Sequence, residues 1–351
     1  MSSTSNLAKI AAEICPADLN DRNVVRGRFA PSPTGYIHLG NAWSFLVCWL
    51  AARKEHGKLV LRIEDIDPDR SKPEYVDGLI EDLHWLGLDW DEGADIGGNY
   101  APYTQSESTG LYERVIEALQ QDGLVYPCFC TRKELRSLAS APHKGDYGTA
   151  YPELCLNLSI EERSQREAEG RRSSMRLHCA KDQINFTDVL HGECCMSWKD
   201  CGGDFPLRRS DGVFAYQLAV VVDDIRQRIT QIVRGEDILH CTPRQVYLYE
   251  LLGCPPPEYI HLPLVVDYEG ERLAKRHGHF ELRKMREAGI SAEAIVGYLA
   301  HLGGLLPVCQ TIDARELLEH FSIDKINTKV LQLEKDVIAR LKELSGVADL
   351  V

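Results

Sequence analysis

The sequence has little that would direct a chain to a membrane or out of the cell. Residues 1–23 contain neither a long apolar run nor a basic segment followed by a cleavage site, so we expect no signal peptide and no membrane anchor. Basic residues are also scarce: 40 Lys and Arg stand against 53 Asp and Glu, and the formal net charge is −13. Because no global positive field is available to attract nucleic acid, any contact with RNA must use local basic patches. No internal repeat or low-complexity segment is present.

What remains is the composition of an ordinary folded protein. A chain of 351 residues with 44% hydrophobic and 26% charged residues can bury a sizeable core and is long enough for two or three domains. Its 12 cysteines are unevenly spaced, and without export signals they indicate reduced thiols, some of which could bind metal. We expect a cytoplasmic monomer.

The N-terminal third predicts a β–α–β unit. Residues 24–30 form a short β-rich run, residues 40–54 a strongly apolar helix and residues 58–63 a second strand. Such a unit is typical of parallel, doubly wound sheets. The sequence therefore predicts an α/β fold with a Rossmann-like parallel sheet.

The rest of the chain divides by its pattern. Helices are predicted over 73–86, 108–122, 160–172 and 243–252, a strand over 226–233, and helical structure from 291 to the end, with a turn at 303–304. The residues after 125 are rich in turns and cysteines, and we interpret them as an insertion between two halves of the sheet. The expected parts are a tail (1–23), a first half (24–125), an inserted subdomain (126–210), a second half (211–290) and a short helical domain or appendage (291–351).

A turn and a helix start follow the first strand. Residues 28–35 read RFAPSPTG, and residues 38–41 read HLGN. A helix N-terminus offers free N–H groups and a favourable dipole to a phosphate, Gly40 allows a nucleotide to approach the backbone, and His38 can donate to phosphate oxygens. The alternative is a surface histidine followed by an ordinary glycine, which a tetrapeptide alone does not exclude.

Two charged residues end the first two predicted strands. Arg28 ends the first, and Glu64 follows the second within LRIEDID, residues 61–67. The carboxyl ends of parallel strands meet at one edge, where α/β sheets bind ligands. An arginine fork there suits a carboxylate, and a glutamate supplies the countercharge for an amine. The neighbouring acidic residues and Arg70 are interpreted as structural ion pairs.

Thiols gather in the inserted segment. Cys128 and Cys130 form a C-x-C pair, and Tyr151 precedes Cys155 by four positions. Thiolates are suitable ligands for a closed tetrahedral zinc site, but the spacing alone leaves buried reduced cysteines equally open. A second group, at residues 191, 194, 195 and 201, fits no common metal-site spacing.

RFAPSPTG and LRIEDID together resemble the glutamyl branch of the class I aminoacyl-tRNA synthetases. HLGN stands where that class carries HIGH, and RLAKR, residues 272–276, stands where it carries KMSKS, with both serines lost. The resemblance implies activation of L-glutamate by ATP with Mg²⁺. It implies catalytic and ATP-binding roles for His38, Gly40 and Lys275, a glutamate pocket of Arg28, Ala30, Ser32, Glu64, Tyr216 and Arg234, and structural Zn²⁺ on Cys128, Cys130, Tyr151 and Cys155.

Over residues 24–290 the chain further resembles the short glutamyl-Q tRNA(Asp) synthetases. The 61 residues from 291 to 351 are too few for the anticodon-binding domain of the longer enzymes, so we expect none. That family transfers glutamate to queuosine at the wobble position of tRNA(Asp), which makes the anticodon arm the expected partner. The alternatives are a short glutamyl-tRNA synthetase charging the tRNA 3′ end, and an inactive, zinc-stabilised tRNA-binding paralogue, which Asn41 and the serine-free loop would suit.

Overall fold

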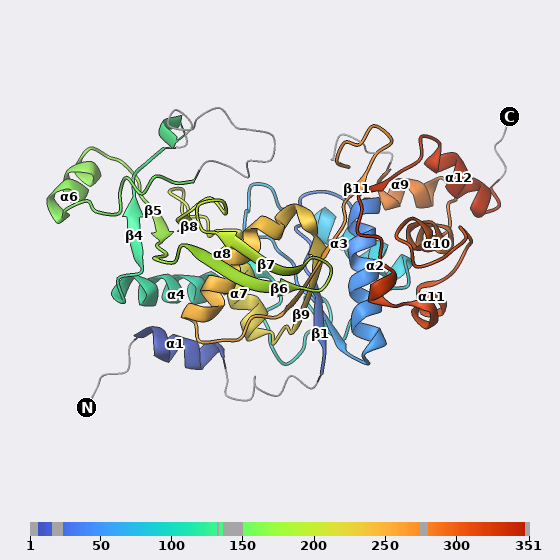
Figure 1. The fold of residues 1–351 in the computed structure, drawn as a ribbon, viewed down its shortest axis with the longest axis horizontal. Coiled ribbons are helices and arrows are strands. Elements are labelled where there is room, and N and C mark those ends of the chain that lie inside the picture. Colours follow the sequence, from blue (N-terminus) through green and yellow to red (C-terminus); the bar gives the residue numbers. More distant parts are fainter. Residues whose placement is uncertain (1–5, 16–23, 132, 136–149, 274–279, 348–351) are drawn as a thin grey trace.

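A parallel sheet runs through the middle of the molecule. The computed structural model describes residues 6–15, 24–131, 133–135, 150–273 and 280–347. Figure 1 shows the sheet between a smaller antiparallel sheet at one end and a group of helices at the other. Helix α1 (Asn6–Ile14) and helix α12 (Val337–Leu344) lie toward opposite ends of the molecule.

The sheet consists of two parallel groups of strands that meet at its centre. One group has the order β1 (Arg26–Phe29), β2 (Lys58–Leu61), β3 (Glu92–Gly93), and the other has the order β7 (Gly192–Ser197), β6 (Gln183–Asp188), β10 (Glu258–Leu262), β9 (Gln231–Gly235). Only β7 runs antiparallel to its neighbour. The Thr230 N–H donates to the Arg26 carbonyl over 2.9 Å and joins β9 to β1. The predicted α/β fold with a parallel sheet is confirmed.

Helix α2 (Leu39–Lys54) packs between β1 and the C-terminal helices. It is buried nearly all round, because its sequence LGNAWSFLVCWLAARK lacks a polar face until Arg53 and Lys54. Its N-cap is His38, in an extended conformation. The helix therefore starts at the carboxyl end of β1, as the β–α–β pattern predicts.

Of the remaining helices of the sheet region, those predicted over 73–86, 108–122 and 243–252 lie close to the predicted positions, and the other three have no predicted counterpart. The helices are α3 (Pro73–Trp85), η2 (Gln105–Ser108), α4 (Thr109–Gln121), α7 (Tyr216–Arg226), η3 (Glu236–Cys241) and α8 (Thr242–Leu251). The strand predicted over 226–233 is wrong at its start: α7 continues to Arg226, Arg228 has φ 58°, and β9 begins at Gln231. The turn precedes the strand because a residue in the left-handed region cannot continue a strand.

The segment predicted as an insertion contributes to two sheets. β4 (Val125–Cys128), β5 (Ser174–Leu177) and β8 (Phe205–Arg208) form an antiparallel sheet, and α6 (Ile160–Ala168) lies beyond it (Figure 1). The hairpin of β6 and β7 instead joins the central sheet through β10. The division of the chain into the five expected parts stays a prediction.

The C-terminal residues share one core with α2. The helices α9 (Leu282–Glu287), α10 (Ala292–Leu302), α11 (Ala314–His320) and α12 bury side chains in the same cluster as Trp43 and Leu46. Contact is so close that a Cβ at Gly303 would lie 2.2 Å from Trp43 Cη2. The prediction of helix to the end misses η5 (Ile323–Lys325) and β12 (Leu331–Gln332), which pairs with β11 (Val265–Val266). Within the described residues, the helices lack the length and hydrophobicity needed to cross a bilayer.

Candidate active site

A cavity of about 440 Å³ opens at the carboxyl ends of β1 and β9. Its wall also includes the turn after β1, the start of α2 and the first residue of α7. All six residues predicted for the amino-acid pocket line it, together with His38; the six are Arg28, Ala30, Ser32, Glu64, Tyr216 and Arg234. The structure therefore brings together residues that lie more than 200 positions apart in the sequence.

Arg28 projects from β1 into the buried floor of this cavity and is 4% exposed. Its Nε lies 3.4 Å from Asp224 Oδ1, and its Nη1 donates to the Val233 carbonyl over 3.4 Å. Burial opposes the charge and is the largest single influence, but Asp224, Tyr216 and Glu64 together outweigh it and raise the pKa of Arg28. In the described part of the chain, Nη2 makes no hydrogen bond, so a fork remains for a ligand carboxylate.

Glu64 pairs with Arg62, an arginine that the sequence analysis did not single out. Its Oε1 lies 3.0 Å from Arg62 Nη2, and Arg62 Nη1 lies 2.7 Å from Asp224 Oδ1. Asp224 thus holds both Arg28 and Arg62. Burial raises the pKa of Glu64, against the two guanidinium groups, which lower it. Arg28, Arg62, Glu64 and Asp224 therefore form a cluster of charged side chains with fixed geometry beneath the cavity.

Arg234 projects from β9 and is 6% exposed. Its nitrogens donate to the His261 Nε2, to Gln245 Oε1 and to Thr242 Oγ1 over 2.9, 2.7 and 2.8 Å. All three acceptors are neutral groups, so direct contact with them does not neutralise the guanidinium. An anionic ligand would supply the missing charge.

Tyr216 and the Pro–Ser turn complete the wall. Tyr216 begins α7, and burial raises the pKa of its phenol, so the hydroxyl is a neutral hydrogen-bonding group at physiological pH. Ala30 and Ser32 flank Pro31, whose carbonyl accepts from the Glu64 N–H over 3.0 Å. This bond holds the turn after β1 against the end of β2.

His38 and Asn41 form a capping box at the N-terminus of α2, in which the side chain of each accepts from the backbone of the other. His38 Nδ1 accepts from the N–H groups of Gly40 and Asn41 over 3.1 and 3.4 Å, and Asn41 Oδ1 accepts from the His38 N–H over 3.3 Å. Two of the N–H groups expected to bind phosphate are therefore occupied. Since Nδ1 accepts, the proton of the neutral ring sits on Nε2. Burial lowers the pKa of His38 to about 4, so this N–H is its donor to a ligand.

This cap explains why residue 40 is a glycine and residue 41 an asparagine. A Cβ at Gly40 would lie 3.1 Å from His38 Cε1, so the glycine makes room for the imidazole itself rather than only for a nucleotide. Asn41, which departs from the HIGH signature, supplies the acceptor that closes the capping box. The departure is compatible with an intact helix start.

A second cavity, of about 260 Å³, continues from the first. The two share His38, Asn41, Ser44, Gly235 and Asp237, and the second also contains Gly40 and Arg272. Asp237 lies 3.6 Å from Arg272, the first residue of the RLAKR loop. Lys275 lies outside the described residues, and its role stays a prediction.

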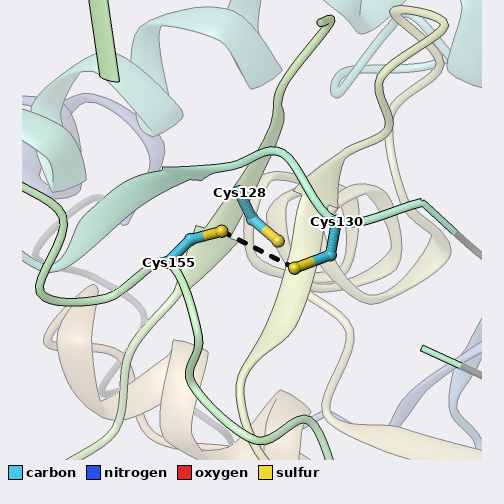
Figure 2. Close-up of side chains that lie close together, drawn as sticks. All are labelled: Cys128, Cys130 and Cys155. Carbon is cyan, nitrogen blue, oxygen red and sulfur yellow. Dashed lines mark hydrogen bonds between the residues drawn. The ribbon is translucent and has the colours of Figure 1, made fainter. Parts of the chain in front are cut away.

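Three thiols and a phenol meet at the end of β4. The sulfur atoms of Cys128, Cys130 and Cys155 all lie within 4.8 Å of one another, and Figure 2 shows them pointing toward a common centre. Cys130 and Cys155 are 3.6 Å apart. The Tyr151 hydroxyl lies 3.2 Å from Cys128 Sγ and 3.8 Å from Cys130 Sγ. The four groups predicted as a ligand set are therefore adjacent.

These distances fit the edges of a zinc tetrahedron. With Zn–S of about 2.3 Å and Zn–O of about 2.0 Å, sulfur atoms would lie about 3.8 Å apart and sulfur and oxygen about 3.5 Å apart. Arg176 stacks its guanidinium 3.9 Å above the Tyr151 ring, and Arg166 Nη1 lies 3.6 Å from Cys155 Sγ. Burial opposes ionisation of Cys128, but Tyr151 and Arg176 outweigh it and lower the pKa of this thiol. The donors present suit a thiophilic cation.

Sequence reasoning missed several residues that shape the cavity. Arg62 offered a signal, because it lies two positions before Glu64 and so faces the same side of the strand. For Asp224 the sequence gives no such signal, since it shows only that Asp223 and Asp224 follow a buried hydrophobic run. Thr242, Gln245 and His261, which hold Arg234, come from elements whose packing the sequence does not reveal.

This fold and this cavity are those of a tRNA synthetase of class I. Residues 24–343 match the model of the family described as tRNA synthetases class I (E and Q), catalytic domain. The chain belongs to this family and is a ligase of that class.

Two curated relatives differ in how much of their length the chain spans. The chain is 56% identical over 320 residues to the glutamyl-Q tRNA(Asp) synthetase of Nitratidesulfovibrio vulgaris, covering 91% of this chain and 99% of that protein. It is 41% identical to glutamate–tRNA ligase 2 of Syntrophus aciditrophicus, covering 91% of this chain and 66% of that protein.

A solved structure shares the fold. The glutamate tRNA ligase of Elizabethkingia meningosepticum, crystallised in complex with its amino acid, superposes with a TM-score of 0.76 at 28% identity. The alignment covers 91% of this chain and 69% of that one.

Proposed function

We propose that this enzyme activates L-glutamate with ATP and transfers it to the queuosine base of tRNA(Asp). The observation that carries the activation step is the cavity itself, whose wall includes Arg28, Arg234, Glu64 and Tyr216. Glutamate has two carboxylates and one ammonium, and these side chains offer two guanidinium groups and one carboxylate. The 56% identity to a relative named glutamyl-Q tRNA(Asp) synthetase supports the choice of acceptor.

In the first step, the glutamate α-carboxylate attacks the α-phosphorus of MgATP and pyrophosphate leaves. The carboxylate is already an anion, so no general base is required, and positioning and charge stabilisation carry the rate. His38 donates from Nε2 to phosphate oxygens, and the Lys275 ammonium neutralises the leaving pyrophosphate. The second cavity, between His38 and Arg272, holds the rest of the nucleotide.

In the second step, a hydroxyl of the queuosine cyclopentenediol attacks the carbonyl carbon of glutamyl-adenylate, an ester forms and AMP leaves. The anticodon arm of tRNA(Asp) brings that hydroxyl to the open side of the cavity. Cys128, Cys130, Tyr151 and Cys155 would hold a structural zinc ion, which would tie the end of β4 to the chain around Cys155 and would take no part in the reaction.

The acceptor is tested with tRNA(Asp) that carries either queuosine or guanosine at the wobble position, each with or without its 3′-terminal adenosine. Radiolabelled glutamate and ATP are added, and the label on tRNA is counted. We expect labelling of both queuosine forms and of neither guanosine form. Labelling that depends on the terminal adenosine and ignores queuosine would identify a short glutamyl-tRNA synthetase. Absence of labelling and of glutamate-dependent pyrophosphate exchange would identify an inactive tRNA-binding paralogue.

A further inference from the structure

Arg234 stands at the end of a buried chain of hydrogen bonds across three neighbouring strands. Its Nε lies 2.9 Å from His261 Nε2 on β10, and His261 Nδ1 lies 2.6 Å from Asp188 Oδ2 at the end of β6. His261 is 0% exposed and Asp188 is 1% exposed. Arg234 and His261 are paired in register, so the strands themselves set this alignment.

The protons along the chain follow from its two ends. A guanidinium Nε always carries hydrogen, so His261 Nε2 must present its lone pair to Arg234. His261 Nδ1 must then carry the ring proton and donate it to Asp188. Asp188 Oδ2 also accepts from the His261 N–H, and Oδ1 accepts from the N–H groups of Leu190 and His191 over 3.0 Å each. Asp188 is surrounded by donors and acts as an acceptor only.

The same arrangement decides which donors of Arg234 stay free. A guanidinium has five N–H groups. His261, Thr242 and Gln245 engage three of them, and Gln245 is itself fixed by its 2.7 Å bond to Gln217. Among the residues that the structure describes, one N–H on each terminal nitrogen has no acceptor, on a side chain that lines the cavity.

We infer that Asp188 and His261 are positioning residues for Arg234. Asp188 holds the imidazole in the tautomer with hydrogen on Nδ1, and the bare Nε2 then holds one edge of the guanidinium so that its two free N–H groups face a substrate carboxylate. This inference rests on the proposed function, in which the cavity binds glutamate.

The variant Asp188→Asn tests the tautomer directly. The Leu190 and His191 N–H groups require an acceptor, so the amide oxygen takes the Oδ1 place and the amide NH₂ faces His261 Nδ1. The ring proton must then move to Nε2, where it opposes the Arg234 N–H. We expect the KM for glutamate to rise about 10- to 100-fold, the effect of an unsatisfied buried donor, with kcat changed less than about threefold and the KM for ATP unchanged.

The readouts are glutamate-dependent pyrophosphate exchange and imidazole ¹⁵N NMR. In the wild type, the His261 resonances should show protonated Nδ1 and bare Nε2, and in Asp188→Asn the two should exchange roles. His261→Gln identifies the resonances and is also the rescue variant, because its amide oxygen can accept from Arg234 and has no tautomer. Asp188→Asn should therefore add little to the glutamate KM in a His261→Gln background.

Asp204→Asn is the matched control, because Asp204 and His178 form another histidine–aspartate pair, at 3.0 Å, whose residues do not line the cavity. It should leave the KM for glutamate unchanged. An equal rise of this KM in both His261 backgrounds, or a loss of kcat alone, would overturn the inference.

Two further comparisons keep the test decisive. If Asp188→Asn does not fold, His261→Gln and His261→Leu replace it: only the leucine should raise the glutamate KM, and equal values would contradict the positioning role. If the wild type activates another amino acid and not glutamate, the proposed function fails, while the ¹⁵N exchange and the KM for that amino acid still test the chain from Asp188 to Arg234.

Discussion

The amino-acid cavity and the thiol cluster are both buried polar sites, but they differ in what holds them together. Under the cavity, Arg28 and Arg62 share the carboxylate of Asp224 and Arg62 also pairs with Glu64, so these two positive and two negative charges balance within the protein. At the thiol cluster, Cys128, Cys130 and Cys155 bring like groups together, and only an added cation can satisfy all of them once they ionise. The first site is organised before its ligand arrives, whereas on our proposal the second is completed by a bound zinc ion.

The variant with the largest expected effect, Arg28→Ala, disrupts the amino-acid cavity and leaves the thiol cluster intact. Arg28→Ala removes a buried carboxylate fork. Truncating one partner of a buried charge pair between a protein and its ligand costs about 2–5 kcal/mol, which corresponds to about two to three orders of magnitude in activity. We expect glutamate-dependent pyrophosphate exchange to fall by that factor. The fold should persist, because Asp224 keeps its 2.7 Å contact with Arg62.

Arg53→Ala is the control for this variant, since Arg53 pairs with Asp89 and Asp91 at the far end of α2 and should leave activation unchanged. Circular dichroism checks the fold, and metal analysis should give the same zinc content for both variants. Adenylate formation near the wild-type rate in Arg28→Ala would refute the proposed pocket.

The second variant, Cys128→Ser, disrupts the thiol cluster and leaves the amino-acid cavity intact. Cys128→Ser weakens one of three sulfur ligands, so we expect loss of bound zinc and greater proteolytic cleavage between β4 and β5, with a destabilisation of several kcal/mol for the metal-linked segment. Pyrophosphate exchange should change by less than about threefold, because the cluster does not line the cavity.

The matched variant is Cys194→Ser, on a partly exposed thiol of β7 outside the cluster. Inductively coupled plasma mass spectrometry measures the zinc. Purified wild-type protein without zinc, resistant to protease and unchanged by chelator, would contradict a structural metal site.

The third prediction separates binding from turnover within the active site. Lys275→Ala should lower kcat for activation about 100-fold while the KM for glutamate changes little, since the ammonium acts on the leaving pyrophosphate and not on the amino acid. Steady-state pyrophosphate exchange gives both constants. Lys284→Ala, on α9, provides a comparison lysine. An unchanged kcat would remove Lys275 from the mechanism.

The smallest expected effect concerns pH. Burial lowers the pKa of His38 and of His261 to about 4, below the ordinary histidine value. Because the unfolded chain binds these protons first, the contribution to stability is present above about pH 6.5 and is lost as pH falls toward 4. Each imidazole should lower the free energy of unfolding by up to about 2 kcal/mol between pH 7 and pH 5.

Urea unfolding at these two pH values measures the loss. His261→Gln should reduce the pH dependence by the share of one imidazole, whereas His320→Gln, on an exposed side chain, should not. Equal slopes for wild type and His261→Gln would show that His261 titrates normally in the folded protein.

The sequence predicts the part of the site that depends on strand ends. Arg28 lies near the end of β1 and Glu64 follows β2, so their convergence on one edge follows from the β–α–β pattern alone. The pairing of Glu64 with Arg62 and the position of Asp224 do not, because they depend on how α7 packs against the sheet. The resemblance implies the four members of the thiol cluster, but the spacing alone does not, because nothing in the sequence between Cys130 and Tyr151 indicates that the chain returns to the first two cysteines.

The strand predicted over 226–233 shows the same limit in the fold. Its residues are compatible with a strand, but the buried face of α7 extends the helix to Arg226, and tertiary packing decides the boundary. Likewise, nothing in residues 183–188 indicates that they pair with β10 rather than with the rest of the inserted segment.

The tight contact between Gly303 and Trp43 has a consequence for protein engineering. Trp43 lies one turn into the helix that His38 caps, and the Gly303 backbone leaves no space for a side chain against its ring. Cutting the chain near residue 290 to obtain a minimal catalytic module would uncover this indole and its neighbours on α2. The C-terminal helices thus form part of the same hydrophobic core as α2, and they cannot be removed or replaced as an independent domain.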